Sequence, residues 1–471
     1  MKALNTLRGL YVRSPRFVRN VARPFVSLVP TKMKFGRSYA DLRQRVAKVA
    51  EDPDFAAEQH LVALRALVEK AHAGSPFYRA EIERAFGASF DPSRMMPADL
   101  GRLPVLNKAR LKAAGDAVLA VPRQQVDSAE TSGSNSEPSF AFYLDRDRSP
   151  REMAFVYDAW SRIGFDENTP RASLRGFSLA DQTGIMDWDP ALKELKLAVF
   201  PLSASDAVLY VDEIDRRRIR YLYGYPSAIE LFCRRLVQTG RRPKLPILGI
   251  LPISEPIHDH QRKLIRSVLG PVAFAPFYGL SEKVAFAVEI DEERGVYEFN
   301  PLYGVAELLD DDDKPVTERG REGRIVATGF LSTGMPFIRY DTRDFARLVQ
   351  LPTHGNGYRL RIEAIAPRRK PGFLITAVGD RVVATDLAPE DPEFFKGVSE
   401  YQFHQHKAGI VVMRYIPDDK GSVADAQRMT RYFAEKVRNA LSFELQQVTQ
   451  IASGRGGKRA FIDQRLDLEL Y

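Results

Sequence analysis

Apolar side chains recur at helical spacing in the first part of the chain. The recurring residues are Leu61, Leu64, Leu67 and Val68. This spacing places apolar side chains on one face of a helix. Ser75-Pro76 interrupts the pattern, so residues 41–89 are predicted to form successive helices. Asn107 is suited to cap a further helix that begins at Lys108.

The central part of the chain alternates between helical patterns and short apolar runs. Helices are predicted at 227–238 and 258–268. Apolar runs occupy 247–251, 272–277 and 323–329. Alternation of this kind is typical of an α/β arrangement. Residues 296–299 and 305–309 resemble the two strands of a hairpin, which adds antiparallel character.

The composition of the chain changes near residues 366–372, where the sequence is Ala-Pro-Arg-Arg-Lys-Pro-Gly. Such a stretch favours a linker. Beyond it, strands are predicted at 373–377 and 409–416, and a helix at 424–440. We therefore predict an α/β protein with a large N-terminal part and a small α+β C-terminal domain, for which the family resemblance given below implies mobility.

Length and composition are those of an ordinary folded protein. The 471 residues exceed the roughly 100 to 150 of a typical domain, so at least two hydrophobic cores are expected. Hydrophobic residues make up 44% and charged residues 28%, which argues against disorder. The one cysteine, Cys233, excludes a disulfide framework and is predicted to be buried and unreactive. No apolar run approaches the roughly 20 residues of a membrane-spanning helix.

Positive charge is concentrated at the N-terminus of the chain. The basic residues there are Lys2, Arg8, Arg13, Arg16, Arg19, Arg23, Lys32, Lys34 and Arg37, and the first acid is Asp41. Apolar residues lie between them, so residues 1–40 are predicted to form a basic amphipathic segment that can lie on an anionic membrane surface. A transit-peptide-like beginning and a basic arm packed on its own domain remain as alternatives. Nucleic-acid binding is disfavoured, because no recognised nucleic-acid module accompanies the charge.

Two segments have the chemistry to hold a nucleotide's phosphates. The loop at 130–139, Glu-Thr-Ser-Gly-Ser-Asn-Ser-Glu-Pro-Ser, offers hydroxyls and backbone N–H groups to phosphate oxygens, although such a loop is also an ordinary turn. It lacks the Gly-Lys-Ser/Thr ending of a Walker loop. Lys458 lies in a glycine-rich stretch and can reach into a cleft, where it would neutralise the charge that develops on a phosphate or carboxylate in the transition state. A frayed basic tail is the alternative.

Two further segments offer a ring and carboxylates. Tyr278 and Glu282 follow an apolar run, so the ring can stack on a purine and the carboxylate can hold Mg²⁺. Asp344 closes the segment Arg-Tyr-Asp-Thr-Arg-Asp and can accept hydrogen bonds from ribose hydroxyls. A simple turn and a solvated Arg/Asp pair are the alternatives. The pairs His258/His260 and His404/His406 lack a third ligand and do not indicate a metal site.

The order and spacing of these segments resemble the adenylate-forming superfamily. Within it, the chain is similar to phenylacetate-CoA ligases and especially to their capsular polysaccharide biosynthesis (CapK-type) relatives. The resemblance covers about residues 40–471. Supporting segments are Ser75-Pro76-Phe77-Tyr78-Arg79, Leu103-Pro104-Val105-Leu106-Asn107-Lys108, Tyr223-Gly224-Tyr225-Pro226-Ser227 and Ser254-Glu255-Pro256.

The resemblance implies roles for particular residues. Ser132, Gly133 and Ser134 would contact ATP phosphates, and Tyr278 would stack on adenine. Glu282 would be the Mg²⁺ ligand and a catalytic residue, and Asp344 would bind the ribose. Arg369, or Arg368, would be the linker arginine, and Lys458 the catalytic lysine of adenylation. Further implied cofactor-binding positions are Ser254, Glu255, Pro256, Gly279 and Ser281. The implied domains are an adenylation domain at 41–367, a hinge at 368–372 and a C-terminal lid at 373–471.

The implied activity is ATP- and Mg²⁺-dependent activation of a small carboxylic acid as an acyl-adenylate. The acyl group would pass to coenzyme A or to another nucleophile such as a sugar or amine, in a setting of surface polysaccharide synthesis. We expect a cytoplasmic protein, with peripheral membrane contact through residues 1–40 as a second alternative. The chain departs from the family pattern at Glu137, which replaces a phosphate-facing lysine, and at 368–372, where the acidic hinge is missing. These departures leave open a degenerate nucleotide- or acyl-binding protein, and an acyltransferase that does not use ATP remains a third class.

Overall fold

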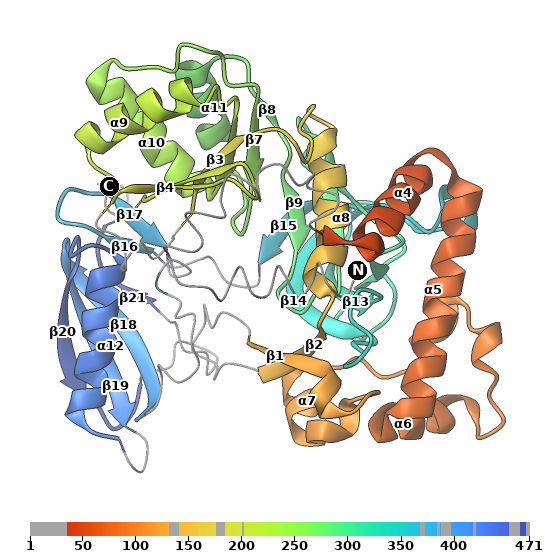
Figure 1. Ribbon diagram of the computed structural model, residues 1–471. Coiled ribbons are helices and arrows are strands. Elements are labelled where there is room, and N and C mark those ends of the chain that lie inside the picture. Colours follow the sequence, from red (N-terminus) through yellow and green to blue (C-terminus); the bar gives the residue numbers. More distant parts are fainter. Residues whose placement is uncertain are drawn as a thin grey trace.

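The computed structural model describes residues 35–130, 141–175, 184–199, 202–367, 373–383, 387, 397–417, 421–451 and 462–467. N-terminal helices lie along one side of the molecule, a layer of helices covers a sheet at the top, and the C-terminal part lies at the opposite side (Figure 1). The α-helices are α4 (Arg37–Glu51), α5 (Pro53–Gly74), α6 (Pro76–Phe86), α7 (Lys108–Ala114), α8 (Arg148–Ser161), α9 (Ala204–Arg216), α10 (Pro226–Thr239), α11 (Asp259–Leu269) and α12 (Val423–Lys436).

The N-terminal helices begin where local hydrogen bonding predicts. Ser75 accepts a hydrogen bond from the backbone N–H of Tyr78 at 3.3 Å, and Pro76 opens α6 with its fixed φ. Asn107 caps α7 in the same way, accepting from the N–H of Arg110 at 3.0 Å. Both predicted helix boundaries are confirmed.

The predicted α/β alternation forms a six-stranded sheet in the order β4-β5-β3-β6-β7-β8. Its strands are β3 (Arg171–Leu174), β4 (Met186–Asp189), β5 (Glu194–Leu197), β6 (Tyr221–Gly224), β7 (Gly249–Pro252) and β8 (Ala273–Phe274). All neighbouring pairs are parallel except β4 with β5. Helices α9, α10 and α11 alternate with these strands and lie together over the sheet (Figure 1). Cys233 of α10 is fully buried in this core, and burial raises the pKa of its thiol to about 12, so it is unreactive as predicted.

A second, antiparallel sheet has the order β12-β13-β14-β15-β11-β10-β9. Its strands are β9 (Phe277–Gly279), β10 (Phe286–Asp291), β11 (Val296–Phe299), β12 (Gly304–Leu309), β13 (Glu322–Gly329), β14 (Tyr340–Gln350) and β15 (Arg361–Pro367). The predicted hairpin between β11 and β12 is wrong: β11 pairs with β10 and β15, whereas β12 pairs with β13. The connection between β11 and β12 carries Leu302 and Tyr303, which are buried, and this packing directs the two strands to different parts of the sheet.

The C-terminal part contains a separate small sheet. Strands β18 (Val398–Lys407), β19 (Ile410–Pro417), β20 (Ser442–Gln447) and β21 (Ile462–Gln464) form it in the order β20-β19-β18-β21, next to α12. A short hairpin, β16 (Phe373–Ile375) with β17 (Arg381–Val383), precedes it. Helix α12 ends at Lys436, before the predicted residue 440, because Arg438 and Asn439 have φ of 49° and 58°, in the left-handed region. The predicted hinge at 368–372 lies outside the described residues.

The described chain begins in a packed region. Tyr39 of α4 is buried and donates a hydrogen bond to Glu167, and Arg43 pairs with Asp158 of α8 at 2.7 Å. The end of the predicted segment 1–40 therefore belongs to a helix of the fold, while residues 1–34 lie outside the described part. Among the described residues, none of the helices is long and apolar enough to cross a membrane.

Candidate functional site

Tyr278 and Asp344 meet although 66 residues separate them in the chain. Tyr278 lies on the short strand β9, and Asp344 on β14. The Tyr278 hydroxyl donates a hydrogen bond to Oδ2 of Asp344 at 2.8 Å, and its ring lies edge-on to Phe299. Burial raises the pKa of Asp344 to about 6, opposed by the Tyr278 donor and supported by the nearby carboxylates of Glu282 and Asp341. Burial also raises the pKa of Tyr278 well above its ordinary value.

Glu282 is the second carboxylate of this corner. It lies in the turn after β9 and is 6% exposed. The hydroxyl of Tyr340, at the start of β14, donates to its Oε1 at 2.7 Å. The ammonium of Lys108 lies 3.8 Å from the same oxygen. Tyr278, Glu282 and Asp344 thus share one corner, in which Glu282 is buried and the other two are half-buried. Their roles toward a nucleotide stay predictions.

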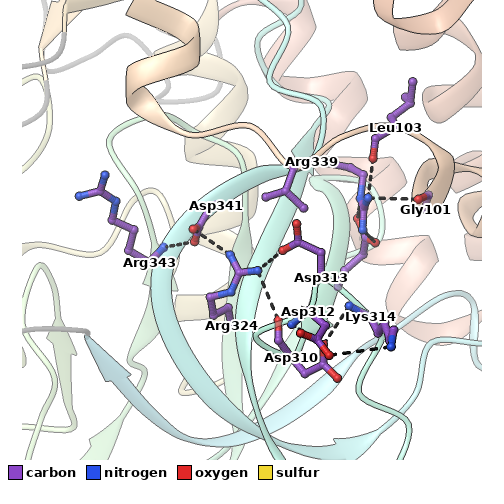
Figure 2. A network of polar contacts seen from close by, with 12 residues as sticks. Gly101, Leu103, Asp310, Asp312, Asp313, Lys314, Arg324, Arg339, Asp341 and Arg343 are labelled. Atoms are coloured by element: carbon purple, nitrogen blue, oxygen red, sulfur yellow. Dashed lines mark hydrogen bonds and ion pairs between the residues drawn. The ribbon is translucent and has the colours of Figure 1, made fainter. Parts of the chain in front are cut away.

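Asp341 and Asp344 belong to the same motif but have different surroundings. Asp341 pairs with Arg324 of β13 at 2.9 Å, and Arg324 also contacts Asp313 (Figure 2). The register of β13 against β14 shifts at this point, and Arg343 has φ 65°. An irregularity of this kind changes the direction of the following side chains. One acid is consequently used in a structural ion pair, while the other faces Tyr278.

Lys108 was not assigned to the site from the sequence. Residues 103–108 run beside the start of β14: the N–H of Leu106 donates to the carbonyl of Arg339 at 2.8 Å, and the N–H of Asp341 donates to the carbonyl of Leu106 at 2.8 Å. These two bonds bring Lys108, the first residue of α7, to Glu282. The segment has a recognisable sequence, but a contact across such a long chain separation leaves no local pattern.

The segment Ser254-Glu255-Pro256 follows the carboxyl end of β7. Ser254 has φ 63°, and Glu255 accepts hydrogen bonds from the N–H and hydroxyl of Ser227, at 3.2 and 3.1 Å. Burial raises the pKa of Glu255 to about 7. Carboxyl ends of parallel strands are where ligands bind in open α/β sheets. The hydrogen bonds of Glu255 nevertheless go to the start of α10 and not to Tyr278 or Asp344.

The remaining predicted positions divide into two groups. Gly279 lies on β9 opposite Phe286, and Ser281 is exposed in the turn beside Glu282. The other group lies outside the described residues and comprises Ser132, Gly133, Ser134, Arg369 and Lys458. The loop predicted to bind phosphates is flanked by an antiparallel pair of described strands, β1 (Val126–Glu130) and β2 (Ala141–Asp145).

Comparison with known proteins adds an independent observation. The chain is 26% identical over 365 residues to a phenylacetate-coenzyme A ligase of Pseudomonas putida, covering 75% of this chain and 80% of that protein. It is 25% identical over 335 residues to a phenylacetate-coenzyme A ligase of Aromatoleum evansii, covering 66% of this chain and 70% of that protein. The chain is phenylacetate-CoA ligase-like. The resemblance to phenylacetate-CoA ligases drawn from the motifs is confirmed, and its CapK-type part stays a prediction.

Two other comparisons add no further argument for this phenylacetate-CoA ligase-like chain. No family model matches it. Among solved structures, a 2-hydroxyisobutyryl-CoA ligase in complex with 2-HIB-AMP and CoA is similar with a TM-score of 0.49 and 17% identity, covering 88% of this chain and 90% of that chain.

The described side chains do not form a complete metal site of their own. They fit a metal ion that is bound partly by the phosphates of a nucleotide. Within the described ranges, no group of three or more histidine, cysteine or acidic side chains is placed to hold an ion. Mg²⁺ is commonly bound through one or two carboxylates together with substrate phosphates. Glu282 can supply such a carboxylate, because the contact with Tyr340 uses only Oε1.

Proposed function

We propose that this chain uses ATP to activate a carboxylic acid and then transfers the acyl group to coenzyme A. In the first step a carboxylate oxygen bonds to the α-phosphorus and pyrophosphate leaves. In the second, the thiol sulfur bonds to the acyl carbon and AMP leaves, while the thiol proton is lost. The observation that carries the proposal is the shared corner of Tyr278, Glu282 and Asp344 in a chain similar to phenylacetate-CoA ligases.

The described residues would position the nucleotide. Asp344 in its ionised form would accept hydrogen bonds from the ribose hydroxyls, and the Tyr278 ring would pack against adenine. The Lys108 ammonium would offset negative charge near the phosphates. Ser132, Gly133, Ser134 and Lys458 complete the proposed site from the sequence alone. Catalysis would come chiefly from positioning and charge stabilisation.

Mg²⁺ is proposed to accompany ATP. When bound, it would neutralise charge on the phosphate oxygens. Glu282 would hold it, with Tyr340 and Lys108 fixing the orientation of this carboxylate from the other side. Second partners of a ligating carboxylate generally set its direction.

The setting of the reaction is a finer proposal. The CapK-type resemblance supports transfer to a sugar or amine in surface polysaccharide assembly, and the basic segment 1–40 supports a cytoplasmic protein with peripheral membrane contact. Removing residues 1–36 should reduce partition onto anionic vesicles and leave partition onto neutral vesicles unchanged. Unchanged partition onto anionic vesicles would contradict the membrane part of the proposal.

The activity is tested by following pyrophosphate and AMP over a panel of carboxylic acids that includes phenylacetate, with and without coenzyme A. Acid-dependent pyrophosphate release is expected, with AMP and a thioester when coenzyme A is present. Lys458→Ala should suppress adenylation. Asp344→Asn should weaken ATP binding, whereas Asp341→Asn, in the same motif, should chiefly lower stability because Asp341 pairs with Arg324.

A second function, a binding protein without turnover, is favoured by Glu137 in the phosphate loop. An acid there would repel the triphosphate. ATP binding without pyrophosphate release for any acid would support this alternative. Restored turnover in Glu137→Lys would identify the acid as the cause, while activity with pre-formed acyl donors alone would instead indicate an acyltransferase.

A further inference from the structure

The residue after Glu282 has an unusual backbone conformation. Lys283 has φ 57°, which side-chain-bearing residues rarely adopt. Its N–H donates to the carbonyl of Leu280 at 3.0 Å and closes the turn that contains Glu282. Strained backbone of this kind persists only where the surrounding structure enforces it.

A distant residue holds the Lys283 side chain. Its ammonium pairs with Oε1 of Glu152, on α8, at 2.7 Å, and both side chains are largely buried, with 24% and 21% exposed. Glu152 also accepts from the hydroxyl of Tyr303 at 3.5 Å, and Tyr303 is 1% exposed. A short, charge-assisted hydrogen bond to an anchored helix is stronger than an exposed surface pair.

The backbone after Lys283 is confined as well. A Cβ on Gly304 would come within 2.8 Å of the carbonyl oxygen of Val284, and a Cβ on Gly329 within 2.8 Å of the Val284 Cα. Glycine at this paired position of β12 and β13 therefore lets the segment pack closely against both strands. The turn is fixed by packing on one side and by the ion pair on the other.

From this arrangement we propose that Lys283 and Glu152 form a positioning pair that orients Glu282 toward the metal–nucleotide complex. The orientation of Glu282 is then fixed in two ways. Tyr340 and Lys108 contact its carboxylate, while the Lys283–Glu152 pair holds the backbone of its turn in place. The inference rests on the proposed function, because it assigns Glu282 a metal-bearing nucleotide. Loss of the pair loosens the turn without removing any group that touches the nucleotide.

The test measures ATP binding by calorimetry at increasing Mg²⁺, together with pyrophosphate release. Lys283→Met and Glu152→Gln should each raise the Mg²⁺ concentration for half-maximal ATP binding about tenfold, as loss of outer partners of a metal ligand does. At saturating Mg²⁺, kcat should stay near that of the unmodified chain. Lys283→Arg, which keeps the positive charge, should retain most of the Mg²⁺ affinity that Lys283→Met loses.

Lys196→Met is the matched control. It breaks an ion pair with Asp189 of similar exposure, 27% and 25%, at the far edge of the parallel sheet. It should leave the Mg²⁺ requirement unchanged. Thermal unfolding of every variant identifies any that fails to fold, in which case Glu152→Gln tests the pair without altering the strained residue.

The outcomes separate the inference from the function. An unchanged Mg²⁺ requirement in folded Lys283→Met and Glu152→Gln, in a chain that still releases pyrophosphate, overturns the positioning pair alone. An equal change in Lys196→Met shows a general stability effect and also overturns it. If the unmodified chain binds no ATP at any Mg²⁺ concentration, the proposed function fails and the inference falls with it.

Discussion

Two carboxylates in this chain, Glu194, which is buried, and Asp344, which is half-buried, have different electrostatic surroundings. Glu194 of β5 pairs with Arg171 of β3 at 2.8 Å, and both residues are less than 5% exposed. Burial acts to raise the pKa of Glu194, but the charge and hydrogen bond of Arg171 hold it below its ordinary value. At Asp344 burial raises the pKa to about 6, because the neighbouring acids add to it and the Tyr278 donor and the Lys108 charge only partly oppose it. The Arg171 partner outweighs burial at Glu194, whereas burial outweighs the opposing groups at Asp344.

The difference distinguishes a structural pair from a candidate binding site. A carboxylate whose pKa is raised on folding costs stability when it is ionised, so its retention needs another reason. Perturbed groups of this kind cluster at functional sites. The raised pKa of Asp344 therefore suits a corner that is completed by a ligand, and the following predictions test the contrast.

The largest effect is expected for Arg171→Met. It leaves Glu194 buried and unpaired, so the free energy of unfolding should fall by about 3–5 kcal/mol in denaturant titrations. The double variant Arg171→Met/Glu194→Leu should recover most of the loss, because no charge remains to be buried. A single variant within about 1 kcal/mol of the unmodified chain would remove the contrast between the two regions.

Asp344→Asn should raise the free energy of unfolding, which is opposite to the effect of Arg171→Met. The carboxyl pKa moves from 3.8 to about 6 on folding, so ionising it at pH 7 costs at most about 3 kcal/mol, and the amide should restore part of this. ATP binding should weaken at the same time. Unfolding titrations and calorimetry measure the two effects. Lower stability in the variant would show that the Asp344 charge is compensated after all.

The stability difference between Asp344→Asn and the unmodified chain should depend on pH. The folded pKa lies above the unfolded value, so Asp344 keeps its proton to a higher pH in the folded state than in the unfolded state. The difference should be small below about pH 4, grow between about pH 4 and 6, and stay constant above that range. ATP binding by the unmodified chain should weaken as the pH falls through about 6, since a protonated Asp344 accepts ribose hydroxyls less well. A flat profile in both measurements would contradict the assigned pKa.

The smallest effect is expected for Lys108→Met. Lys108 lowers the pKa of Asp344 through its charge, so its removal should move the midpoint of the pH profile upward, by less than about one unit for a screened charge. Measuring ATP binding against pH gives the shift, and Lys112→Met, on the same helix, is a suitable control. A downward shift would mean that Lys108 does not act on this corner.

Features governed by near neighbours were predictable from the sequence. Ser75 and Asn107 cap their helices through backbone N–H groups three residues away, so a short motif contains both partners. The alternation of apolar runs and helices likewise defined the parallel sheet, and the motif order defined the phenylacetate-CoA ligase-like character. Of the candidate site, Tyr278, Glu282 and Asp344 were identified by residue type and order before their proximity was known.

Tertiary structure alone decided the partners of these residues. The strand pattern at 296–299 and 305–309 was correct, but the pairing was not, because packing of the whole sheet selects the neighbour of each strand. Lys108 reaches Glu282, and Glu152 reaches Lys283, across more than 100 residues. The sequence determined which chemical groups the chain carries and where its local elements begin. Long-range packing determined which of those groups meet, and therefore that the pKa of Glu194 is lowered while that of Asp344 is raised.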